Sequence, residues 1–97
     1  MTERYAALAY GWIAAGATPF HATPNITSCT YDQKLHRYEI TIKDEEYVWQ
    51  KFVTLVQPEG QCFAVPSPSD DGKLTVCLFN AQGQPSQANF QFVIYKL

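Results

Sequence analysis

Histidine and cysteine are the side chains that most readily act as bases or nucleophiles in enzymes. The chain has two histidines, His21 and His36, and each falls in a segment with the character of a loop or a turn. A nucleophile needs a base beside it, and the sequence contains no GxSxG motif or comparable combination. We therefore expect no catalytic residues and a protein that is not an enzyme. An enzyme whose site the sequence does not reveal is the least favoured hypothesis.

The sequence also predicts neither a metal site nor a cofactor. The three cysteines, Cys29, Cys62 and Cys77, have no CxxC or CxxH spacing, and an odd number cannot be fully paired within one chain. We interpret them as reduced thiols that pack as small apolar side chains. Glu39 could be imagined as one half of an acid–base pair with Glu45 or Asp44, but solvated positions on a strand and the following turn are favoured. No glycine-rich phosphate-binding motif is present.

Composition and charge exclude two classes of partner. The 97 residues include seven basic and nine acidic side chains, with a net charge of −2 and no basic patch. Nucleic-acid binding, which requires such a patch, is not expected. No apolar run approaches the roughly 20 residues that span a bilayer, so we expect no membrane insertion. One domain over residues 1–97 is the default for this length.

The spacing of apolar residues predicts an all-β fold. In the segment 37–43, Tyr38, Ile40 and Ile42 alternate with polar residues, as in a half-buried strand. Comparable patterns predict strands at 25–31, 51–57, 73–79 and 89–97. Turn residues separate them, notably in the segments 70–72 and 80–85. Short strands between turns indicate an antiparallel sandwich or a jelly-roll-like domain.

The N-terminal segment is ambiguous between a helix and a strand. Leu8, Trp12 and Ile13 belong to an apolar stripe with helical spacing, and several alanines lie between them. In the strand alternative, Leu8, Tyr10 and Trp12 share one face. Local physics slightly favours the helix, and both alternatives remain open at this point.

The aromatic residues provide the main candidates for binding. The chain has six Tyr, six Phe and two Trp. Tyr47, Trp49 and Gln50 follow an acidic turn and are the candidate ligand-binding residues, because aromatic faces stack on sugar rings while amides bond the hydroxyls. The alternative is that these aromatics pack in the core or at a subunit interface.

Two predicted strands, 51–57 and 89–97, carry apolar residues on both faces. In an isolated two-layer sandwich, one face of each sheet contacts solvent and should be polar. We therefore expect a second subunit to cover this face. The candidate interface residues are Tyr10, Trp12, Val53, Leu55, Val93 and Tyr95.

The order of the strand and turn residues resembles a known group of domains. The segments that carry the resemblance are AYGWI at 9–13, NIT at 25–27 leading to Tyr31 and Asp32, RYEITI at 37–42, FVTLV at 52–56 followed by Pro58, and NFQFVIYK at 89–96. They are similar to the small β domains at the C-terminal ends of phage tail fibres and bacterial collagen-like or surface fibre proteins. The resemblance spans nearly the whole chain, and its motifs are structural.

The resemblance implies a strand in the N-terminal segment and a homotrimer that ends a fibre on a virion or cell surface. Such a tip would contact a glycan or a protein and would be cytoplasmic during assembly. The sequence shows no upstream shaft, so it is either a piece of a longer fibre or a free-standing chain. For a free-standing chain, a capsid decoration (cement) protein is the alternative. The leading hypothesis is a noncatalytic structural and binding module.

Overall fold

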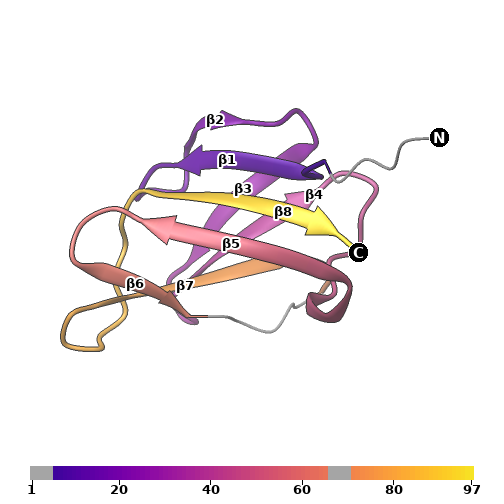
Figure 1. The fold of residues 1–97 in the computed structure, drawn as a ribbon. Coiled ribbons are helices and arrows are strands. Elements are labelled where there is room, and N and C mark those ends of the chain that lie inside the picture. The colour runs from indigo at the N-terminus through magenta and orange to yellow at the C-terminus, as the bar shows by residue number, and fades with distance from the viewer. Residues whose placement is uncertain (1–5, 66–70) are drawn as a thin grey trace.

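The computed structural model describes residues 6–65 and 71–97, and within them the chain forms a two-layer β-sandwich (Figure 1). The first sheet, called the β1 sheet, has the order β2-β1-β8-β5. Its strands are β2 (Pro19–Ala22), β1 (Ala9–Ile13), β8 (Phe90–Lys96) and β5 (Phe52–Pro58). The second, called the β4 sheet, has the order β3-β4-β7-β6. Its strands are β3 (Ile26–Asp32), β4 (Arg37–Ile42), β7 (Leu74–Asn80) and β6 (Cys62–Val65).

All strand pairs are antiparallel, so the predicted all-β antiparallel sandwich is confirmed. A 3₁₀ turn, η1 (Trp49–Lys51), precedes β5. In the part of the chain that the structure describes, no helix has the length and apolar character needed to cross a bilayer.

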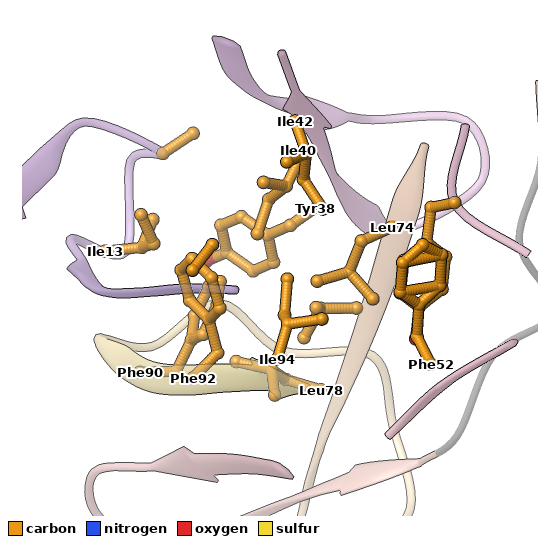
Figure 2. Close-up of a cluster of buried hydrophobic side chains, with 14 residues drawn as sticks. Ile13, Tyr38, Ile40, Ile42, Phe52, Leu74, Leu78, Phe90, Phe92 and Ile94 are labelled. Atoms are coloured by element: carbon orange, nitrogen blue, oxygen red, sulfur yellow. The ribbon is translucent and has the colours of Figure 1, made fainter. Parts of the chain in front are cut away.

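The core lies between the sheets and is built from alternate residues of each strand. On β4, Tyr38 and Ile40 are fully buried while their neighbours are half-buried, and on β8 Phe90 and Ile94 follow the same alternation. Figure 2 shows Tyr38 and Phe90 pointing toward one another from opposite sheets, with their ring centroids 4.8 Å apart in an edge-to-face arrangement. Such aromatic contacts contribute about 0.5–1.5 kcal/mol beyond the buried area.

The Tyr38 hydroxyl satisfies its hydrogen-bonding needs inside the core. It donates to the carbonyl oxygen of Ala15 at 2.7 Å, in the turn that follows β1. Burial raises the pKa of this hydroxyl above its ordinary value. The bond connects the β1–β2 turn to the opposite sheet, because Tyr38 is on β4. Losing the bond would leave a buried hydroxyl without a partner, which costs about 1–3 kcal/mol.

The N-terminal segment is a strand, as the resemblance implied, and the helix that local physics favoured does not form. β1 pairs with β2 on one side and with β8 on the other, so its backbone groups have partners along both edges. Gly11 faces the interior opposite Phe92. A Cβ atom at Gly11 would lie 3.1 Å from Phe92 Cε1 and 2.9 Å from the carbonyl oxygen of His21. The glycine therefore makes room for the Phe92 ring.

The strands expected at 25–31, 37–43, 51–57, 73–79 and 89–97 all form, with ends shifted by one residue at most. Sequence analysis missed β2 and β6, which have four residues each, too few to show a clear alternation. In the expected turn at 70–72, Asp71 and Gly72 have φ values of 53° and 72°. Asp70 lies outside the described residues.

We predict that Gly11→Ala destabilises the domain by about 1–3 kcal/mol, because the added methyl group overpacks the space beside Phe92. Gly16→Ala is the matched control, since a Cβ atom there meets nothing within 4 Å. Urea unfolding of both variants measures the difference. Equal midpoints for the two would contradict the packing assigned to Gly11.

Candidate functional site

The outer face of the β1 sheet carries cross-strand rows of apolar side chains. Tyr10 pairs with Val93, and Val93 pairs with Leu55, so these three side chains form one row across β1, β8 and β5. Tyr10 is 58% exposed and Leu55 is 62% exposed. A second row pairs Tyr95 with Val53, and both of these are also exposed. Large apolar side chains are thus in contact with solvent along two neighbouring rows.

We define the outer face as the residues of the β1 sheet that point away from the core. It includes every candidate interface residue from the sequence analysis, because the strands pair in the register that brings them together. Its members are Tyr10, Trp12, His21, Val53, Leu55, Gln57, Gln91, Val93 and Tyr95. The shared face is a finding of the structure, whereas the contact with another subunit stays a prediction.

A hollow of about 680 Å³ lies on this face, beside a third row of side chains. Trp12 pairs with His21 on one side and with Gln91 on the other, and Gln91 pairs with Gln57. Among the described residues, the side chains of His21, Gln57 and Gln91 have no hydrogen-bond partner. An indole beside free carboxamides can stack on a neutral ring and bond its polar groups. Sequence analysis named Trp12 as an interface residue but missed His21, Gln57 and Gln91. The only signal of the two glutamines was their polar character within an apolar strand.

Of the predicted ligand-binding residues Tyr47, Trp49 and Gln50, the structure buries Tyr47. Tyr47 is only 5% exposed, its ring stacks on Phe52 with centroids 4.8 Å apart, and its hydroxyl lies 2.6 Å from Thr54 Oγ1. The expectation that Tyr47 is accessible was therefore wrong, because the turn η1 brings this segment back onto the core. Gln50 is exposed, and the Trp49 side chain lies outside the described part of the structure.

The carboxylates that could have formed an acid–base pair lie on different elements. Glu39 is on β4 and accepts a hydrogen bond from Arg37 Nε at 3.1 Å. Glu45 is in the turn after β4 and forms an ion pair with Lys96 Nζ at 2.8 Å. Each thus has a basic partner of its own. In residues 6–65 and 71–97, no group of three His, Cys, Asp or Glu side chains is placed to hold a metal ion.

The three cysteines are free thiols. Cys29 lies opposite Ile40 on the inner face of β3 and packs against the core. Burial raises the pKa of its thiol to about 11. Cys62 donates to the carbonyl oxygen of Glu59 at 3.0 Å. A thiol with a raised pKa is a poor nucleophile near neutral pH, so Cys29 suits a packing role.

Comparison of the chain with protein-family models, curated proteins and solved structures gave no match. A sandwich architecture by itself assigns no activity, because unrelated functions occur on the same fold. The chemistry of the outer face is therefore the basis on which a function can be proposed.

We predict that alkylation of Cys29 by iodoacetamide in the folded protein rises with pH toward a midpoint near 11. In the unfolded chain the midpoint should lie near the ordinary thiol value, so at pH 8 the folded protein holds about a hundredfold less Cys29 thiolate. Peptide mapping by mass spectrometry follows this thiol separately from the others. A folded-state midpoint below pH 9 would contradict the burial of Cys29.

Proposed function

We propose that the chain is a noncatalytic structural module that self-associates through the outer face of the β1 sheet. The expected assembly is a homotrimer at the tip of a fibre or on a virion. The observation that carries the proposal is the presence of six apolar and aromatic side chains in adjacent rows on one exposed sheet face.

The composition of the outer face suits contact with another copy of the chain. It contains no Asp, Glu, Lys or Arg, so bringing two such faces together desolvates no fixed charge. Contiguous apolar patches of several hundred Å² are uncommon on monomers and mark interaction sites. The aromatic residues Tyr10, Trp12 and Tyr95 are of the types enriched in protein interfaces.

Association would also compensate for the small size of the domain. A chain of 97 residues buries only about 60–65% of the surface that its unfolded form exposes. Any contact made by the folded state alone stabilises that state by mass action. The number three comes from the resemblance to fibre-tip domains. The same face would also suit the alternative function, a decoration protein that docks on a capsid shell.

The hollow beside Trp12 supports glycan binding as a second candidate function. It has an indole, two unpartnered carboxamides and one imidazole, with no carboxylate or ammonium group on the same rows. A neutral sugar would stack on Trp12 and accept or donate hydrogen bonds at Gln57 and Gln91. In this second proposal the glycan binds at the outer face rather than at Tyr47, Trp49 and Gln50.

We predict that the outer-face contact by itself gives a mass near three times the 11.0 kDa of one chain in light scattering after size exclusion. Val93→Asp, at the centre of the face, should weaken association by more than about 2 kcal/mol, because the contact would bury an unpaired charge. Ser28→Asp is the control, since Ser28 is exposed on the other sheet. A wild-type monomer at all concentrations would refute self-association.

For the second candidate, we predict that neutral oligosaccharides on a glycan array bind the wild-type protein and that Trp12→Ala abolishes this binding. Gln57→Ala should weaken it without unfolding, because Gln57 is exposed. Thermal melting of both variants separates lost binding from lost folding. Undiminished binding by two folded variants would exclude the hollow as the sugar site.

A further inference from the structure

The free edge of β5 differs from the other three sheet edges. Proteins usually protect edge strands by keeping them short or by placing prolines, charges or bulges in them. β2 and β6 have four residues each, and β3 has an irregular register between Ile26 and Ser28. β5 has seven residues, pairs with β8 in unbroken register and contains no charged side chain. Its one proline, Pro58, is the last residue of the strand. Figure 1 shows β5 at the margin of its sheet.

The hydrogen bonds flanking β5 show which backbone groups point away from β8. Leu97 N donates to Lys51 O at 2.9 Å, and Glu59 N donates to Asn89 O at 2.9 Å. Hydrogen-bonded pairs alternate along an antiparallel ladder, so the odd-numbered residues of β5 bond to β8. The N–H and C=O groups of Thr54 and Val56 therefore point to the free edge. Among the described residues, β5 has no second strand partner.

We propose that this edge pairs with β5 of a second copy of the chain, antiparallel and centred on Leu55. The proposal rests on the proposed function only in requiring that the chain associates with itself. A row of alternating backbone donors and acceptors is satisfied by another extended strand. A copy of β5 supplies an uncharged strand of equal length.

Three observations select Leu55 as the centre of the pair. It is the middle residue of Phe52–Pro58, so this register gives the longest overlap. When the twofold axis passes between two identical residues, the outer faces of both copies lie on the same side of the joined sheet. A register shift of one residue would put the outer face of the second copy on the opposite side. Finally, Lys51 and Glu59 lie four residues on either side of Leu55, and both are exposed. Each Lys51 then lies opposite the acidic residue of the other copy.

The backbone groups also match in this register. Thr54 lies opposite Val56 of the other copy, and both have their N–H and C=O groups on the free edge, so they form hydrogen-bonded pairs. The two Leu55 side chains meet across a non-hydrogen-bonded pair, where side chains approach most closely. The row of Tyr10, Val93 and Leu55 then continues into the second copy, and the two sheets become one sheet of eight strands.

The contact has twofold symmetry, because the same strand is used by both copies. It is compatible with a threefold contact through the outer face. The two contacts together would give an assembly of six chains, and the edge contact alone would give a dimer. The mass thus distinguishes the contacts.

A charge exchange tests the register. Lys51→Glu or Glu59→Lys alone should weaken association at least severalfold, because each places like charges opposite one another at both ends of the pair. The double variant should restore the wild-type dissociation constant, which sedimentation velocity measures. Lys34→Glu is the control, since Lys34 is exposed in the turn between β3 and β4. Additive losses in the double variant would overturn the register.

A second measurement places the twofold axis. Leu55→Cys should form a disulfide between copies under mild oxidation, because the two residues 55 lie opposite each other. Val53→Cys, equally on the outer face, lies opposite Gln57 of the other copy and should not cross-link through position 53. Mass spectrometry of the linked peptides separates these bonds from those of the native cysteines. If the chain assembles but position 55 does not cross-link, the edge contact is wrong while self-association stands. A monomer would contradict both.

Discussion

The pairing of β8 with β1 on one side and β5 on the other is the interaction on which the rest of the structure depends. β8 supplies Phe90, Phe92 and Ile94 to the core from one face and Val93 and Tyr95 to the outer face from the other. Its register with both neighbours decides which side chains share a row. A shift of one residue in either ladder would exchange core and surface side chains, so the core and the outer face are specified together.

Strands with apolar residues on both faces give this domain a buried hydrophobic core and also an exposed apolar surface. In β4 the polar residues Arg37 and Glu39 lie on the solvent side and form an ion pair, as expected for a surface that faces water. In β5 the corresponding positions hold Val53 and Leu55, whose side chains are apolar and exposed. A sheet that ends in such a strand is suited to association through its face and through its edge. Both proposals therefore involve β5, which supplies Val53 and Leu55 to the outer face and forms one edge of the β1 sheet.

Most of the strands and their buried faces could be predicted from the sequence, because the alternation of apolar and polar residues is a local property. The pattern of Tyr38, Ile40 and Ile42 defined a strand and its buried face, and the second apolar face of β5 identified Val53 and Leu55 as surface residues. Tyr47 could not be placed, because its burial depends on how η1 turns the chain toward Phe52. The row of Trp12, Gln91 and Gln57 depends on registers between distant strands, which no local pattern encodes.

The position of β8 along the chain has a consequence for biosynthesis. Ala9 of β1 pairs with Ile94 of β8, so the ladder joins the first described strand to the last. During translation, β1 and β5 are both synthesised before their common partner exists. The β1 sheet can close only after nearly all of these residues have been made, and non-local closure of this kind is slow. Until then the FVTLV segment is available to any extended strand nearby, and a chaperone that shields it would improve the yield of folded protein.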